Sequence, residues 1–156
     1  MNESGRVATT PSDEPLRGEP FTMIVERGKI REFARAVKSR NAAYLDDEDA
    51  LCPATFLMTA AFWQRRQHAA PGAPSELRRI LHGEQEFVFF GPPPRAGDVL
   101  TGTQYVRRVW TRKGSRAGDM TFYEVVTEFK DGTGRLAVES RAVLIETGSP
   151  AEGPTE

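Results

Sequence analysis

Few residues of this chain are of the types that bind metals or act as nucleophiles. Its two histidines, His68 and His82, are far apart and have no cysteine or aspartate at ligand spacing. Residues 46–49 form an unbroken acidic run, without the alternation and the glycine that a calcium loop requires. Cys52, the single cysteine, has no histidine near it in the sequence. We therefore expect no metal site and no cysteine nucleophile, and we interpret the acidic run as a solvated loop.

A basic cluster is a candidate site for an anion. It comprises Arg107, Arg108, Arg112, Lys113 and Arg116, at the end of one predicted strand and in the loop that follows. Arginine binds phosphate groups well, so the cluster can hold a phosphate-bearing ligand. The alternative is a charged hairpin loop that stays in solvent. The net charge of −1 gives no general attraction to nucleic acid or to anionic membranes, and we expect neither as a partner.

Backbone N–H groups at the start of a predicted helix are a second candidate. Pro53 suits the first turn of a helix over residues 54–67. The free N–H groups of Ala54 and Thr55, with the helix dipole behind them, can stabilise negative charge that develops on an oxygen. The alternative is an ordinary capped core helix, since such ends are common.

Two predicted helices differ in their apolar pattern. Residues 28–40 place Ile30, Phe33 and Val37 at helical spacing between charged residues, which predicts an amphipathic helix. Residues 54–67 carry apolar side chains in every direction, Phe56 and Leu57 among them. A helix that is apolar all round is buried all round, so the remaining sequence must wrap it.

The remaining sequence predicts strands over residues 84–90, 99–110, 121–130 and 135–146. Asp131-Gly132 is a hairpin signal between the last two. Helices followed by consecutive antiparallel strands indicate the α+β class. One curled antiparallel sheet wrapped around a buried central helix is the hot-dog fold.

Composition predicts one domain with polar ends. The chain has 156 residues, 38% hydrophobic and 28% charged, which suits one domain with a real core. Residues 20–147 form the predicted domain, and residues 1–19 and 148–156 are predicted disordered tails. No run approaches the ~20 apolar residues of a membrane span. The first residues lack a secretory signal and no disulfide can form within the chain, so we expect a cytoplasmic location.

Residues 21–146 resemble the MaoC-like hydratase/dehydratase family, most closely its N-terminal or non-catalytic type of domain. Residues 26–56, 81–100 and 123–146 carry the resemblance, together with the predicted buried helix. It implies an acyl thioester as substrate, presented on CoA or on an acyl carrier protein, with no cofactor of the protein's own. It also implies that Phe56 and Leu57 shape an acyl tunnel, that His82 lies at a strand entry near the substrate, and that Arg112 and Lys113 meet the nucleotide tail or the carrier. A structural role is the alternative for His82.

Catalytic members of that family carry an Asp and, five residues on, a His, with an Asn-Pro pair between them. The resemblance aligns Asn41 with the family's Asn, which puts Ser39 at the Asp position and Tyr44 at the His position, with Ala42 for Pro. Hydration needs a base to activate water and an acid to protonate carbon. The hydroxyls of Ser39 and Tyr44 ionise far above neutral pH, so the usual dyad is absent.

The resulting hypothesis is a degenerate subunit of an (R)-type enoyl-thioester hydratase or dehydratase. It would supply acyl tunnel and dimer interface to a MaoC-like catalytic subunit, in a heterodimer or heterotetramer. Two alternatives remain open. The first is a non-enzymatic hot-dog protein that binds acyl thioesters or acts as a scaffold. The second is a self-sufficient homodimer, for instance a thioesterase.

Overall fold

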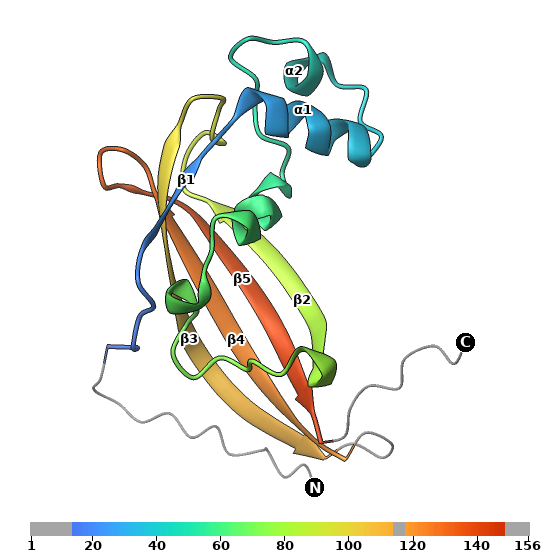
Figure 1. The fold of residues 1–156 in the computed structure, drawn as a ribbon, viewed down its shortest axis with the longest axis vertical. Coiled ribbons are helices and arrows are strands. Elements are labelled where there is room, and N and C mark those ends of the chain that lie inside the picture. The colour runs from blue at the N-terminus through green and yellow to red at the C-terminus, as the bar shows by residue number, and fades with distance from the viewer. Residues whose placement is uncertain (1–13, 114–117, 149–156) are drawn as a thin grey trace, which may run out of the picture.

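The computed structural model describes residues 14–113 and 118–148. Its main element is one five-stranded antiparallel sheet with the strand order β1-β3-β4-β5-β2 (Figure 1). The strands are β1 (Phe21–Ile24), β2 (Ile80–Phe89), β3 (Val99–Lys113), β4 (Asp119–Lys130) and β5 (Leu136–Thr147). The four predicted strands are confirmed, each with an end that differs by a few residues, whereas β1 was not predicted. The class, an antiparallel sheet with few helices, is the predicted one.

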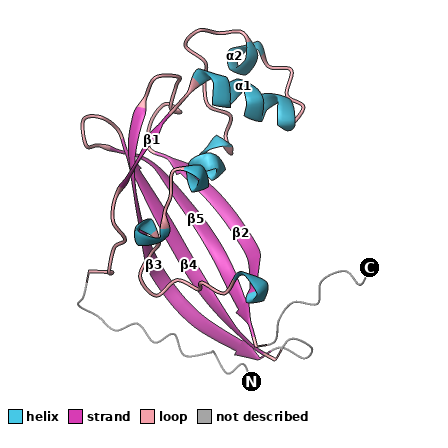
Figure 2. Cartoon of the chain, in the orientation of Figure 1, coloured by secondary structure: helices cyan, strands magenta, loops and turns pink. Residues whose placement is uncertain are grey.

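The helical segments lie at one end of the sheet and along one face of it (Figure 2). They are α1 (Arg27–Ala36), α2 (Ala42–Leu45) and three 3-10 segments, η1 (Phe56–Phe62), η2 (Arg66–His68) and η3 (Leu77–Arg79). The predicted helix over residues 28–40 is α1, and it buries Ile30 and Ala34. It ends before residue 40 because Lys38 adopts a positive φ of 57°, which an α-helix does not continue through.

The central helix differs from the prediction. In place of an α-helix over residues 54–67, the chain forms the seven-residue 3-10 segment η1. Phe56, Leu57 and Ala60 are buried, but Met58 is 45% and Phe62 is 82% exposed. Because residues 54–67 are apolar on all sides, we predicted that the segment is buried on all sides. This prediction is wrong for the side that carries Met58 and Phe62. Only one face of the segment packs on the protein itself.

The core joins the sheet to α1 and η1. Phe56 packs edge-to-face on Phe33 of α1, with ring centroids 5.7 Å apart, and Phe21 of β1 packs in the same manner on Phe129 of β4 at 6.1 Å. A side chain at Gly102 would collide with the ring of Phe21, so the close packing of β1 on β3 requires glycine there.

The described chain begins to pack before residue 20, although residues 1–19 were predicted to be disordered. Arg17 forms a bridge with Tyr105 of β3. The backbone N–H of Gly18 donates to the carbonyl oxygen of Gln104 at 2.9 Å, and that of Glu19 donates to Gln67 at 3.1 Å. The predictions for residues 1–13 and 149–156 fall outside the described residues.

The packing of η1 on the sheet generates a stability prediction. Ala60 is 4% exposed, so Ala60→Asp would bury an unpaired carboxylate at a cost of several kcal/mol. That cost is comparable with the ~5–15 kcal/mol that holds a domain together. We expect Ala60→Asp to abolish cooperative thermal unfolding measured by circular dichroism.

Ala61→Asp is the matched control, because Ala61 is the next residue and is exposed. It should melt close to the unmodified chain. A cooperatively melting Ala60→Asp protein with an unchanged midpoint would contradict this account of the core.

Candidate functional site

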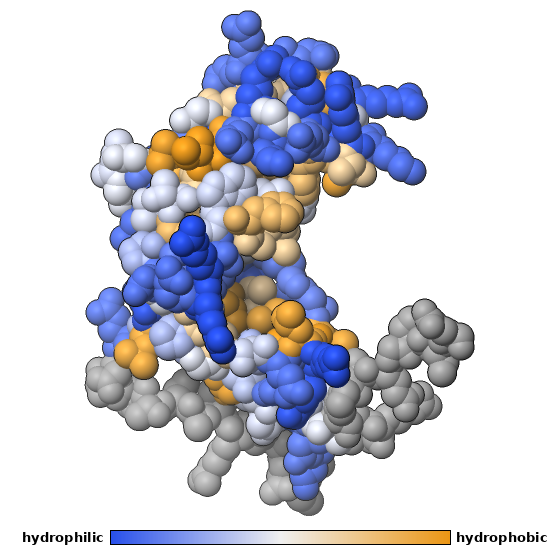
Figure 3. Space-filling view, viewed as in Figure 1, coloured by the Kyte–Doolittle hydropathy of each residue, from blue (hydrophilic) through white to orange (hydrophobic). Residues whose placement is uncertain are grey.

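The main candidate site is a cavity of about 270 Å³ between η1 and one face of the sheet. We call it the inner cavity, and we call that face of the sheet the inner face. Leu57 and Ala60 of η1 cover it, and Val125 and Phe129 of β4 form part of its floor. In the space-filling view, apolar surface is visible about midway along the long axis of the molecule (Figure 3). Its volume is just below the range usual for small-ligand pockets.

Two of the predicted substrate residues line the inner cavity. Leu57 is one, and it is 3% exposed. His82 of β2 is the other, and it stands opposite Leu144 of β5 just before a β-bulge. His82 is also the one titratable side chain that lines the cavity in the described part of the chain.

The predicted anion site at the start of the central helix has a weaker basis than expected. Ala54 and Thr55 are exposed and do not line the inner cavity, and Phe56 is fully buried beneath them. The N–H of Phe56 already donates to the carbonyl oxygen of Pro53 at 2.9 Å. A seven-residue 3-10 segment also aligns fewer peptide dipoles than the predicted α-helix would.

Ser39, Asn41 and Tyr44 form the corner between α1 and α2, away from the inner cavity. Asn41 caps α2, because its Oδ1 accepts a hydrogen bond from the N–H of Ala43 at 3.0 Å. The Oγ of Ser39 accepts from the N–H of Asn41 at 3.3 Å. Tyr44 is half-buried and packs against the core. Each of the three therefore has a structural role in shaping this corner.

A row of polar side chains crosses the floor of the inner cavity, and the sequence did not indicate it. The Nε2 of Gln104 on β3 donates to Oγ1 of Thr127 on β4 at 3.0 Å. The Nε2 of Gln85 on β2 donates to Oγ of Ser140 on β5 at 2.8 Å, and Thr127 and Ser140 are cross-strand partners. All four line the cavity. We call these residues the polar row. The available signal was a glutamine at an inward position on each of two strands. Only the register shows that both glutamines face the same cavity.

Arg112 lies on the opposite, outer face of the sheet and does not meet Leu57 or His82. The guanidinium of Arg108 lies 4.4 Å from the ring of Trp110, Trp110 stacks on Phe122 at 5.2 Å, and Arg112 lies 5.5 Å from Phe122. These four residues border a hollow of about 250 Å³. We call them the aromatic–arginine ladder. Lys113 is exposed at the end of β3. Of the predicted basic cluster, Arg116 lies outside the described residues.

The middle of the outer face is held by ion pairs around a nearly buried carboxylate. Oε2 of Glu139, which is 7% exposed, accepts from Arg141 at 2.7 Å and from Arg107 at 3.2 Å. Arg107 also donates to the hydroxyl of Tyr105 at 3.2 Å, and Arg17 lies over the Tyr105 ring. Burial alone would raise the pKa of Glu139, but the hydrogen bonds from Arg141 and Arg107 outweigh it and hold that pKa below its ordinary value.

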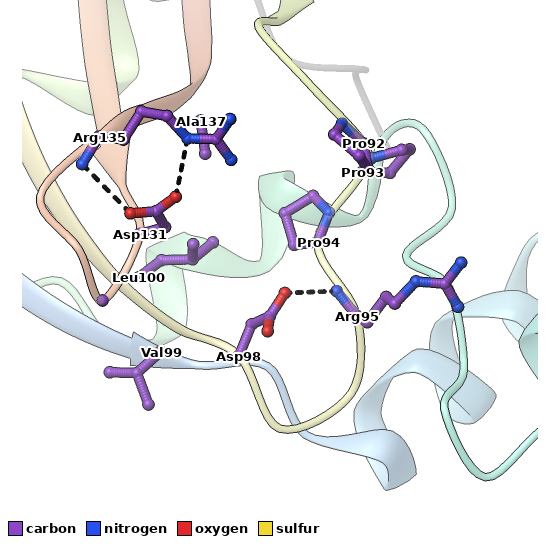
Figure 4. A pocket seen from close by; sticks show the side chains of 11 residues that line it. Pro92, Pro93, Pro94, Arg95, Asp98, Val99, Leu100, Asp131, Arg135 and Ala137 are labelled. Carbon is purple, nitrogen blue, oxygen red and sulfur yellow. Dashed lines mark hydrogen bonds and ion pairs between the residues drawn. The ribbon is translucent and has the colours of Figure 1, made fainter.

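A further hollow of about 260 Å³ lies between the loop of residues 92–94 and the β4–β5 hairpin (Figure 4). Both of its carboxylates are engaged. Asp98 accepts from the N–H of Arg95 at 2.8 Å, and Asp131 accepts from the hydroxyl of Thr133 and from Nε of Arg135 at 3.1 Å. The hydrogen bond from Thr133, supported by those from Arg135, lowers the pKa of Asp131 to about 2. These carboxylates stabilise turns, as the predicted hairpin at Asp131-Gly132 requires.

Other predicted features have simple structural roles. Cys52 is 3% exposed, and burial, followed by the charge of Asp98, raises the pKa of its thiol to about 12. It is therefore an inert core residue. Within residues 14–113 and 118–148, no three His, Cys, Asp or Glu side chains lie close enough together to hold a metal ion. No helix of that part of the chain has the length and apolar character to cross a membrane.

The chain is similar to a known family over most of its length. The family described as the FAS1-like dehydratase domain region matches residues 16–140. A UPF0336 protein of Clavibacter michiganensis subsp. michiganensis is 32% identical over 137 residues, which cover 82% of this chain and 88% of that protein. A UPF0336 protein of Saccharopolyspora erythraea is 31% identical over 160 residues, which cover 92% of this chain and 96% of that protein.

Solved structures with the same fold include a dehydratase complex and a MaoC-like dehydratase. The HadBC (3R-hydroxyacyl-ACP dehydratase) complex from Mycobacterium tuberculosis has a chain that is 26% identical with a TM-score of 0.63, covering 85% of this chain and 98% of that chain. The MaoC-like dehydratase from Rhodospirillum rubrum is 20% identical with a TM-score of 0.56, covering 86% and 94%. These similarities confirm the predicted hot-dog fold.

The outer-face carboxylate generates a pH prediction. Because the pKa of Glu139 in the folded chain lies below its ordinary value of 4.5, Glu139 adds stability above that value. This stability is lost as the pH falls through the lowered pKa. Glu139→Gln should reduce the free energy of unfolding near neutral pH by roughly 1.5–3 kcal/mol, the usual value of hydrogen bonds to a charged group. The difference should shrink as the solution is acidified.

Urea unfolding across a pH series measures this. Glu84→Gln is the control, because Glu84 is exposed on the same face and makes no ion pair within the described residues. A Glu139→Gln deficit that stays constant with pH would show that the ion pairs do not act as described.

Proposed function

We propose that this chain, which belongs to the UPF0336 family and carries the FAS1-like dehydratase domain region, is the acyl-binding, non-catalytic subunit of an enoyl-thioester hydratase or dehydratase. The predicted resemblance to MaoC-like proteins is confirmed by the shared fold. Its substrate would be an acyl thioester carried on CoA or on acyl carrier protein pantetheine. The protein itself would need no cofactor. Hydration chemistry would belong to a second hot-dog subunit.

One observation carries the proposal: the inner cavity is lined largely by apolar side chains, and the described residues place no acid–base pair in it. His82 is the one titratable side chain that lines it in the described part of the chain. Adding water across a double bond requires both a base and an acid near the same bond. Ser39 and Tyr44 lie in the α1–α2 corner, away from the inner cavity, and have structural roles there. A cavity that can bind an acyl chain but has no acid–base pair for hydration suits a subunit that only holds the acyl chain.

A partner subunit is supported by the sheet edge at β2. This strand ends the sheet, so within residues 14–113 and 118–148 one side of its backbone has no neighbouring strand. Apolar side chains flank this edge: Leu81 on β2 is 44% exposed and Leu77, in the preceding η3, is 84% exposed. Phe62 of η1 is 82% exposed. The HadBC structure is a complex, which supports a hot-dog partner for this chain too.

The aromatic–arginine ladder and Lys113 are the proposed contact for the phosphates of CoA or for the carrier protein. Arg112 makes no ion pair with a carboxylate within the described residues, so its charge is available to an anion. Guanidinium groups bind phosphate with paired hydrogen bonds. Ala54 and Thr55 remain proposed contacts for the thioester oxygen.

The activity prediction follows from the missing acid–base pair. General acid and base groups typically contribute ~10²–10⁴-fold each, so the purified single chain should hydrate a panel of short enoyl-CoA thioesters at a barely detectable rate. A complex with a partner that carries the Asp and His should be active. In that complex, Ser39→Ala and Tyr44→Phe should change the rate modestly, and loss of the partner's Asp or His should abolish it.

His82→Ala is an informative control in the single chain. Robust turnover by the chain alone that disappears with Tyr44→Phe or His82→Ala would make this protein a catalyst in its own right. Binding of acyl-CoA without activity in any complex would favour the alternative of a non-enzymatic acyl-thioester-binding protein.

The oligomer prediction follows from the open edge. We expect light scattering to detect a dimer at micromolar concentration, either of this chain or with its partner. Leu81→Lys should shift the population to monomer, because a charge at a paired edge opposes strand addition. Val99→Lys is the matched control, because Val99 is also 45% exposed but lies opposite Ile24 of β1, on the other side of the sheet from β2. A stable monomer both with and without the partner would contradict the proposal.

A further inference from the structure

We propose that the inner cavity selects acyl groups that carry a hydroxyl or other oxygen function partway along the chain, and that the polar row recognises this oxygen. The inference rests on the proposed acyl-thioester-binding function and names its substrate class. A cavity for a plain alkyl chain has no use for amide groups in its floor. Gln85, Gln104, Thr127 and Ser140 place two amides and two hydroxyls there.

The hydrogen bonds inside the polar row determine what it offers a ligand. Each glutamine donates from Nε2 to a neighbouring hydroxyl, Gln104 to Thr127 at 3.0 Å and Gln85 to Ser140 at 2.8 Å. Nε2 of Gln85 also donates to the carbonyl oxygen of Glu86 at 3.2 Å. This orients the two amides with Oε1 as the remaining acceptor. Neither Oε1 receives a donor from the described residues. Each hydroxyl accepts one bond and keeps its proton to donate.

A ligand hydroxyl matches this arrangement, because it both donates and accepts. It would donate to Oε1 of a glutamine and accept from the hydroxyl of Thr127 or Ser140. A plain alkyl segment in the same place would remove water from these polar groups and return no hydrogen bond. Sites built to hydrogen-bond a substrate oxygen therefore discriminate against the analogue that lacks it.

The apolar parts of the cavity explain why the oxygen must lie partway along the chain. The polar row crosses β3, β4 and β5 at one level of the floor, where Gln104, Thr127 and Ser140 are cross-strand neighbours. Gln85 on β2 stands opposite Ala142 and reaches Ser140 diagonally. On β4, Val125 and Phe129 lie on either side of Thr127, and all three line the cavity. A chain that follows the strands would meet apolar surface, then the polar row, then apolar surface again. One position along the acyl chain should therefore be preferred for the oxygen.

Titration calorimetry with the full chain tests this, with decanoyl-CoA and the hydroxydecanoyl-CoA isomers substituted beyond C3 as probes, since the 3-hydroxy isomer would be the product of hydration itself. One isomer, or two adjacent ones, should bind roughly 10-fold more tightly than decanoyl-CoA, as a net hydrogen bond of usual strength provides. Gln104→Leu and Gln85→Leu together should remove this preference. Thr127→Val, which keeps the shape of the side chain, should reduce it. Gln67→Leu should keep it, because Gln67 is exposed on η2 and does not line the cavity.

The outcomes separate this inference from the proposed function. If decanoyl-CoA and every hydroxy isomer bind equally well, the acyl-binding function stands and the selection for oxygen is wrong. If the glutamine variants lower the melting temperature but keep the preference, the polar row only joins the strands, and the inference is again overturned. If no acyl-CoA binds to the chain alone or with its partner, both the function and the inference fail.

Discussion

The inner face of the sheet is longer than the helical segment that packs on it. The seven residues of η1 span roughly 14 Å at the rise of a 3-10 helix, whereas the twelve residues of β4 span roughly 40 Å. Apolar side chains continue along the strands past the end of η1. Some of that face is therefore covered by Leu57 and Ala60, and some surrounds empty volume. The cavity is a direct consequence of this mismatch in length. The apolar side of η1 that carries Phe62 is exposed for another reason, since no described element packs against it.

The two faces of the sheet differ in charge. The inner face combines apolar side chains with a hydrogen-bonded polar row that carries no charge, so a neutral ligand can be enclosed without desolvating an ion. The outer face concentrates the charges, and Glu139 is satisfied there by Arg107 and Arg141. Because strand residues alternate between faces, Thr127 and Glu128 serve these two environments from adjacent positions, Thr127 in the polar row and Glu128 in the ion pair with Arg17.

The features that could be predicted from sequence are those encoded over a few neighbouring residues. Alternating strands and the Asp131-Gly132 hairpin have local signals, and both are present. The four-residue strand β1 was too short to stand out, since its stability comes from Phe21 packing over Gly102, far away in the sequence. The central helix was misjudged because an apolar residue signals burial without saying whether the burying surface belongs to the same chain. The exposed Phe62 is such a residue.

The roles of the polar row and of the α1–α2 corner could not be predicted from local sequence either. Gln85 and Gln104 are ordinary polar residues until the register brings them to one floor with Ser140 and Thr127. Asn41 matches the Asn that lies between the Asp and the His in catalytic members of the family, yet its side chain caps α2. Acid–base catalysis depends on two groups held at one bond, so two substitutions in the corner are enough to remove it. The proposed acyl binding would depend on many contacts spread over η1 and four strands, which such substitutions leave intact. A fold of this kind can therefore lose its chemistry and keep its ligand, provided that a second subunit supplies the acid and the base.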